Sequence, residues 1–186
     1  MATLPQLIEQ DIRHIDRSLQ DLLASSEAAI ACVIDKGGFL ITHSAASGGD
    51  SGEFEFDLTT IAALASGAYL ANQTIANLVH EENFDSVYQQ GETFSMLTHN
   101  VDEHCLLVII FPATVGVGVV KYYAARAVGR IARQLEIAHE RDPEHGLDLS
   151  VLNVADVSEF FVKKESPTTQ IKRRRTRKTP PTEPSE

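Results

Sequence analysis

Hydrophobic residues recur at helical spacing near the start of the chain. Between Leu7 and Leu23 the apolar positions follow one another in steps of three and four, with acidic and basic side chains between them. The stripe comprises Ile8, Ile12, Ile15, Leu19 and Leu22. Such a stripe is typical of a helix with one face buried against other elements. The pattern therefore predicts an amphipathic helix over Leu7–Leu23 that lies on a sheet.

Two short apolar runs follow, and a turn signal separates them. The runs are Ala28–Ile34 and Phe39–Thr42, and Asp35-Lys36-Gly37-Gly38 stands between them. Because glycine adopts the positive φ that tight turns require, this pattern predicts a β-hairpin. The segment from Ser44 to Phe56 contains several glycines and is expected to be a loop.

The next helix is predicted over Leu58–Val79, with Asp57 as its N-cap. On a helical wheel the larger apolar side chains favour one stripe as the core-facing side. This stripe comprises Ile61, Leu64, Ala65, Ala68, Ile75, Leu78 and Val79. The opposite side comprises Thr59, Ala63, Ser66, Gly67, Leu70, Gln73, Thr74 and Asn77.

This helix contains no Asp, Glu, Lys or Arg, whereas a water-exposed helix normally has charges on its outer face. Its polar side chains argue against a membrane span, and a domain of this size has little material under which to bury a whole helix. Small uncharged groups let another backbone approach at little desolvation cost. We therefore expect the side opposite the core stripe to be a protein–protein contact surface.

Three more apolar runs predict strands over Phe84–Gln89, Thr93–His99 and His104–Phe111. Pro112 ends the last run, since proline has no N–H to donate to a ladder. A final amphipathic helix is predicted over Val117–Glu140. The order α-β-β-α-β-β-β-α is typical of an α+β domain with one mostly antiparallel sheet.

The composition changes after residue 141. Residues 142–162 are too apolar for a linker and are expected to dock on the domain or on a second chain. Residues 163–186 are rich in Pro, Thr, Ser and charge, which predicts a disordered tail. The predicted organisation is a domain over residues 1–141, an apolar extension over 142–162 and a basic tail over 163–186.

The net charge of −10 is divided unequally between these parts. Residues 163–186 hold eight Lys and Arg against three Glu, a net of +5, which leaves −15 on residues 1–162. The basic side chains cluster at Lys172, Arg173, Arg174, Arg175, Arg177 and Lys178. We expect this cluster to make a salt-dependent contact with an anionic partner, which the sequence leaves open as lipid, nucleic acid or an acidic protein.

No residue pattern predicts a catalytic, metal or cofactor site. The seven histidines include no close pair at helical spacing, and the two cysteines lack the CxxC spacing of structural zinc sites. Signatures of serine hydrolases, P-loop proteins and zinc proteases are absent from the sequence. We therefore expect a protein without its own active site, cofactor or small-molecule substrate. Met1–Gln10 lacks the pattern of a secretory signal, which predicts a cytoplasmic location.

Several stretches of the chain match one family pattern. They are Cys32–Gly38, Ile61–Ala65, Gln90–Glu92, Leu106–Phe111 and Val117–Lys121. With these stretches, the region from Leu7 to about Ile137 resembles the roadblock/dynein light chain family. The resemblance is strongest to bacterial members that partner a small Ras-like GTPase in cell polarity and gliding motility.

The resemblance implies a five-stranded antiparallel sheet between helices. It also implies a dimer in which the second helices pair, the sheets join at their edges, and the paired helices present a platform to a GTPase. The platform then includes Ala63, Gly67 and Leu70. The candidate dimer edge comprises Phe84, Ser86 and Tyr88.

The expected function is that of a homodimer that binds a small Ras-like GTPase and regulates it, by promoting GTP hydrolysis or by scaffolding. The alternative is a scaffold that tethers an assembly to membrane, cytoskeletal filament or DNA through the basic tail. The sequence does not decide between them.

Overall fold

The computed structural model describes residues 5–46 and 56–141. All of them belong to the first of two units of the chain, Met1–Leu147; the second is Asp148–Glu186. The extension predicted over 142–162 and the tail predicted over 163–186, with its basic cluster, lie outside the described residues. So do residues 47–55 of the predicted loop.

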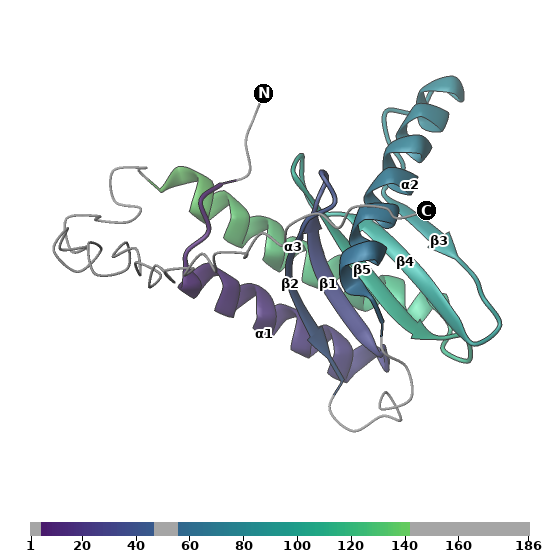
Figure 1. The fold of residues 1–186 in the computed structure, drawn as a ribbon, viewed down its shortest axis with the longest axis horizontal. Helices are drawn as coiled ribbons and strands as arrows, with labels where there is room; N and C mark the ends of the chain where they lie inside the picture. The colour runs from purple at the N-terminus through teal and green to yellow at the C-terminus, as the bar shows by residue number, and fades with distance from the viewer. Residues whose placement is uncertain (1–4, 47–55, 142–186) are drawn as a thin grey trace, which may run out of the picture. The chain divides into compact units, whose positions relative to one another are not determined.

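Three helices and five strands make up the described part of the domain (Figure 1). Their order is α1 (Glu9–Ser26), β1 (Ile30–Asp35), β2 (Leu40–Ala45), α2 (Leu58–Leu78), β3 (Ser86–Gln89), β4 (Phe94–Asn100), β5 (Cys105–Pro112) and α3 (Val117–Glu140). The strands form one sheet in the order β2-β1-β5-β4-β3, and every neighbouring pair is antiparallel. The predicted α+β fold with a five-stranded antiparallel sheet is therefore confirmed.

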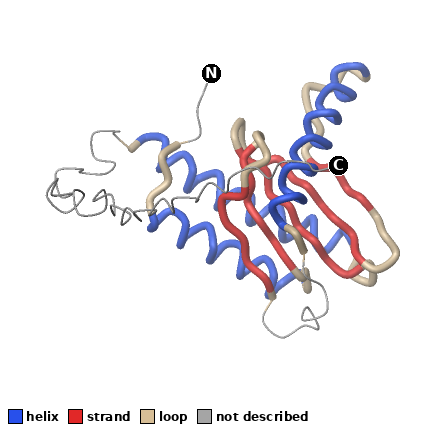
Figure 2. Tube along the Cα trace, viewed as in Figure 1, coloured by secondary structure: helices blue, strands red, loops and turns tan. Residues whose placement is uncertain are grey.

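Helices cover both faces of the sheet, with α1 and α3 on one face and α2 on the other (Figure 2). The central strands show both coverings in their side chains, which alternate between the faces. In β1, Ala31 and Val33 pack with α1 and α3, whereas Cys32 and Ile34 pack with α2. This explains why β1 is an unbroken apolar run, since neither of its faces meets water.

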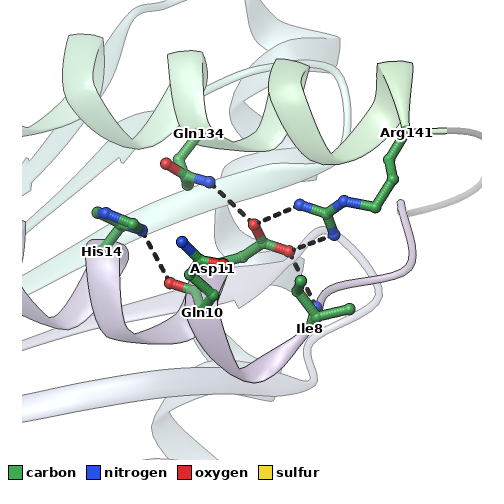
Figure 3. A network of polar contacts seen from close by, with 6 residues as sticks. All are labelled: Ile8, Gln10, Asp11, His14, Gln134 and Arg141. Atoms are coloured by element: carbon green, nitrogen blue, oxygen red, sulfur yellow. Dashed lines mark hydrogen bonds and ion pairs between the residues drawn. The ribbon is translucent and has the colours of Figure 1, made fainter. Parts of the chain in front are cut away.

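The buried carboxylate of Asp11 joins α1 to the end of α3 (Figure 3). Arg141 donates to both of its oxygens at 2.8 Å, and Gln134 Nε2 donates to Oδ1 at 2.9 Å. The backbone N–H of Ile8 donates to Oδ2 at 2.9 Å, which caps the first turn of α1. The hydrogen bonds from Arg141, with the weaker help of the others, lower the pKa of Asp11 to about 2.

Local chemistry fixes several boundaries of the elements. Asp57 is the N-cap of α2, as predicted, because its carboxylate accepts the backbone N–H of Thr60 at 3.1 Å and the Thr60 hydroxyl at 2.6 Å. The first helix runs from Glu9 to Ser26 rather than from Leu7 to Leu23, and it ends where Glu27 takes a left-handed conformation with φ 56°. Strand β2 continues to Ala45 because it pairs with β1 along that whole length.

Candidate protein–protein interface

Helix α2 meets the sheet through small side chains and one aromatic ring. The residues that it buries are Ala62, Ala65, Ser66, Tyr69 and Ala76. Apart from Ala65, this set differs from the predicted core stripe, so the predicted orientation of α2 is wrong. Leu64 is 68% exposed and Leu78 is 76% exposed, although both were expected in the core. Apart from Tyr69, the side chains that α2 buries against the sheet are those of alanine and serine.

The turn between β1 and β2 shows how close this approach is. Gly38 has a φ of 91°, and a Cβ at this position would lie 2.9 Å from the Cα of Ala63. The Lys36 carbonyl accepts a hydrogen bond from the Ser66 hydroxyl. The Lys36 ammonium lies 5.7 Å from the centre of the Tyr69 ring, within the range of a cation–π contact. The N-terminal half of α2 is therefore fixed to the hairpin turn.

Ser66 was predicted on the contact side of α2, and the structure corrects this placement. Ser66 is only 3% exposed, and its hydroxyl donates a hydrogen bond to the Lys36 carbonyl in the hairpin turn. Of the other predicted contact residues, Gln73 is half-buried and lies 3.5 Å from Asn83 Oδ1. The remaining ones are exposed: Thr59, Ala63, Gly67, Leu70, Thr74 and Asn77.

The outward side of α2 is apolar as well as uncharged. We call it the α2 outer face; it comprises Thr59, Ala63, Leu64, Gly67, Leu70, Thr74, Ile75, Asn77, Leu78 and Val79. At the tip of the hairpin beside this helix, Phe39 is 74% exposed. Surface leucines occur singly in most proteins, but several on one helix with no charge between them are typical of an interaction site.

Sequence reasoning missed Phe39 and assigned Leu64, Ile75, Leu78 and Val79 to the core. The signal that could have found Leu64, Ile75 and Leu78 is a second stripe at helical spacing. Ala62, Ala65, Tyr69 and Ala76 follow this spacing, and so do Ile61, Leu64, Ile75 and Leu78. Two apolar stripes on one helix indicate two contact surfaces. Because the Gly37-Gly38 turn allows close approach, it favours the stripe with the smaller side chains as the side that faces the sheet.

Strand β3 forms one edge of the sheet and pairs only with β4 among the strands described. The strand is shorter than predicted and begins at Ser86, so Phe84 precedes it. The side chain of Tyr88 stacks on Phe111 with ring centres 6.2 Å apart. Its hydroxyl lies 3.4 Å from Ser95 Oγ. The edge of β3 leaves backbone groups available for another strand.

The segment that leads into β3 is bonded to α2. The Tyr69 hydroxyl, on α2, lies 3.1 Å from both Asn83 Oδ1 and the Phe84 carbonyl oxygen. Asn83 Nδ2 donates to the same hydroxyl at 2.9 Å. These bonds hold the segment that leads into β3 against the sheet-facing side of α2.

Other candidate chemistry is limited. Cys32 and Cys105 are free thiols, and burial raises the pKa of each to about 12, so neither forms a reactive thiolate at neutral pH. Within residues 5–46 and 56–141 no cluster of three or more His, Cys, Asp or Glu side chains is arranged to hold a metal ion. In the same ranges no helix has the length and hydropathy to cross a membrane.

Comparison with known proteins identifies solved structures that share this fold. No family model and no curated protein sequence matches the chain. Among solved structures, an MglB with a tetrameric arrangement is 29% identical, with 74% of this chain and 99% of that chain covered and a TM-score of 0.68. The gliding protein MglB of Thermus thermophilus is also 29% identical, with 73% and 98% covered and a TM-score of 0.66. A Roadblock/LC7 domain of Streptomyces avermitilis shares the fold at 16% identity, with 65% and 97% covered and a TM-score of 0.54.

The domain has the roadblock fold. The resemblance expected from the sequence is thereby confirmed, both for the roadblock proteins and for their bacterial gliding-motility relatives. The matched structures are covered almost completely, and about a quarter of this chain lies outside the match. The α2 outer face thus belongs to a domain with the roadblock fold.

Proposed function

We propose that the chain forms a homodimer that uses its α2 outer faces to bind and regulate a small Ras-like GTPase. The observation that carries this proposal is the α2 outer face itself, on which Leu64, Leu70, Ile75 and Leu78 are exposed without a charged neighbour on the helix. A free monomer would hold this apolar surface in water. Its burial between subunits and under a partner is favourable at roughly 25 cal/mol per Å².

The comparisons support the partner class. The 29% identical MglB of Thermus thermophilus is a gliding protein. The resemblance to bacterial roadblock proteins implies a small Ras-like GTPase as the molecule that such a dimer receives. The proposed assembly is cytoplasmic, as small Ras-like GTPases are.

Regulation by this chain would act through binding and not through a catalytic group of its own. A surface of small residues flanked by leucines can fit closely against another backbone and hold a GTPase loop in one conformation. Such a contact changes the rate of GTP hydrolysis only if it favours one conformation of the GTPase over another. Without that preference, the same contact would be a scaffold.

Gly67 provides a sharp test of this surface. Apart from the adjoining backbone of its own helix, nothing lies within 4 Å of a Cβ built at Gly67, so packing in the domain does not require glycine there. Glycine inside a helix costs about 1 kcal/mol relative to alanine. The absence of a side chain at this exposed position is consistent with close approach by a partner backbone.

The test combines the full chain with a small Ras-like GTPase encoded in the same genome, and measures binding and single-turnover GTP hydrolysis. Wild-type protein is expected to bind the GTPase, and Gly67→Arg to weaken that binding by about tenfold or more through steric exclusion. Gly118→Arg is the matched control, because a Cβ at this α3 position also has nothing within 4 Å. Equal binding by wild type and Gly67→Arg would contradict the proposed surface.

The hydrolysis rate distinguishes the two forms of regulation. A faster rate with wild type but not with Gly67→Arg supports GTPase activation. An unchanged rate with intact binding supports scaffolding. Absence of binding by wild type to any such GTPase would overturn the proposed partner.

The basic cluster Lys172–Lys178 is the second contact that we propose, with an anionic partner. Its charge is the support for this proposal, since a run of Lys and Arg attracts polyanions at low ionic strength. Full-length protein with these residues changed to glutamine should lose salt-dependent binding to anionic vesicles, duplex DNA or the GTPase assembly. Unchanged binding to all three would contradict a role of the cluster in attachment and with it the tethering alternative.

A further inference from the structure

A groove of about 820 Å³ lies between the C-terminal half of α3 and the turn that joins β4 to β5. Its floor is aliphatic, with Ala132 and Leu135 from α3 and Pro5 from the segment before α1. Because α3 covers the face of the sheet opposite α2, the groove is separate from the α2 outer face. The proposed GTPase surface therefore does not account for it.

The rim of the groove is acidic. Asp102, Glu103, Glu136 and Glu140 line it, together with the guanidinium of Arg133 and the imidazoles of His104 and His139. The Lys36 ammonium interacts with Asp102 and Glu103, so Glu136 and Glu140 carry the excess negative charge. Among the residues that the structure describes, Glu136 and Glu140 have no ion-pair partner. The C-terminal end of α3 adds the partial negative charge of the helix dipole at the same place. The local field therefore favours a cation.

Two further features suit the groove to an occupant. A Cβ built at Gly129, which lines the groove, would have nothing within 4 Å, so this glycine keeps the space open without a packing need in the domain. His104 Nε2 is buried and has no hydrogen-bond partner in the described structure, although Glu103 Oε1 lies 3.3 Å away. Buried polar atoms in native proteins are normally satisfied. An additional group near His104 would account for this one.

We propose that this groove binds a lysine- and arginine-rich peptide segment of a partner protein. Charge complementarity selects this occupant, because long basic side chains place aliphatic stems on an apolar floor and their charged heads beside carboxylates. A lysine or arginine head reaches Glu136 and Glu140 on the rim, and its stem lies over Gly129 and Leu135. The carboxylate of Asp102 is held in place by the backbone N–H groups of His104 and Cys105, at 2.8 and 2.7 Å.

The test titrates the full chain with a fluorescent peptide of lysine, arginine and leucine, followed by anisotropy at low salt. Glu136→Lys combined with Glu140→Lys is expected to weaken binding by about tenfold or more, because attraction becomes repulsion at the rim. The matched control is Glu81→Lys combined with Glu92→Lys, which changes the net charge equally at exposed positions that do not line the groove.

Gly129→Leu tests the floor without changing charge. It is expected to fill the groove and to weaken peptide binding, whereas Gly118→Leu in the same helix should leave binding unchanged. Far-ultraviolet circular dichroism of each variant verifies that the fold is retained. If Gly129→Leu failed to fold, Ala132→Leu at the neighbouring floor position would replace it.

Three results would overturn the proposal. An equal loss in the Glu81/Glu92 control would show general charge attraction and not a site. Unchanged binding by the groove variants would show that the peptide binds elsewhere. Stronger peptide binding after Lys172–Lys178 are changed to glutamine would show that the groove's occupant is the basic cluster of this chain and not a partner's segment.

Discussion

The two faces of the sheet are covered in opposite ways. Helices α1 and α3 bury large aliphatic side chains such as Ile15, Leu19 and Leu135. Their outer sides carry charged groups, including the Arg130–Asp21 ion pair at 2.6 Å. Helix α2 buries mainly alanine and leaves its leucines outside. The first arrangement buries its large apolar side chains within the domain, whereas the second leaves them exposed on the helix for which we propose a partner.

The largest expected difference between the two faces is in the cost of removing a leucine. Leu19→Ala removes a fully buried side chain and should lower the free energy of unfolding by about 2–5 kcal/mol. Leu64→Ala removes an exposed one and should change the stability of the monomer by less than about 0.5 kcal/mol. Urea denaturation at low protein concentration measures both. Similar losses in the two variants would show that α2 is packed like α1.

The next prediction concerns the ion pair that joins α1 to α3. Asp11→Asn removes the charge that Arg141 and Gln134 contact and should cost about 2–3 kcal/mol. Because the folded pKa of Asp11 is lowered to about 2, its stabilisation is present above the ordinary carboxyl pKa. It is lost as the pH falls from about 5 toward 2.

Denaturation midpoints between pH 2 and pH 7 test this dependence. The wild type should lose stability more steeply than Asp11→Asn as the pH falls. Parallel curves would show that the Asp11 network does not determine how α1 is held on α3.

A smaller effect is expected where α2 meets the hairpin turn. Gly38→Ala places a Cβ against the Ala63 backbone in a left-handed conformation and should cost about 1–3 kcal/mol. Gly116→Ala is the control, since a Cβ at that position has nothing within 4 Å. Hydrogen exchange should show faster opening of α2 in the first variant, with α1 and α3 unchanged. Equal protection of α2 in both variants would contradict the close approach described above.

The smallest expected effect is a gain in the stability of the isolated domain. Gly67→Ala should stabilise the isolated domain by about 0.5–1 kcal/mol, because alanine is the better helix former and the space is open. Thermal denaturation at low protein concentration measures it. A loss of stability would mean that the domain itself needs glycine at this position.

The sequence predicted the fold to a large extent because α1, α3 and the strands follow simple patterns. In these elements large apolar residues are buried, and glycine or proline marks several boundaries, such as Gly37 after β1, Gly116 before α3 and Pro112 at the end of β5. The same rule failed for α2, where Leu64 and Leu78 are exposed and Ala62 and Ala76 are buried. Both sides of α2 carry apolar residues, so hydrophobicity alone gives no preference for the side that faces the sheet. Local contacts with the hairpin turn fix the side that faces the sheet: Gly38 leaves room for the Ala63 backbone, and the Lys36 carbonyl accepts the Ser66 hydroxyl.

The candidate surface was predicted as an uncharged helix, but its individual residues were less accessible to sequence reasoning. Ser66 and Thr59 are both small hydroxyl residues, yet Ser66 is buried and Thr59 is exposed. The difference is that the Ser66 hydroxyl bonds to the Lys36 carbonyl in the hairpin turn. Phe39 follows two glycines in a predicted hairpin, and its exposure depends on how the turn meets α2. Contacts between segments distant in the sequence determine both.

Sedimentation equilibrium of wild type and single variants tests the central claim most directly, namely that the α2 outer face is a subunit contact. We predict a dimer of the 20.4 kDa chain for wild type and a folded monomer for Leu78→Glu. The matched variant Ile137→Glu, at an exposed apolar position of α3, should remain a dimer. A monomeric wild type, or a Leu78→Glu protein as dimeric as Ile137→Glu, would contradict the account.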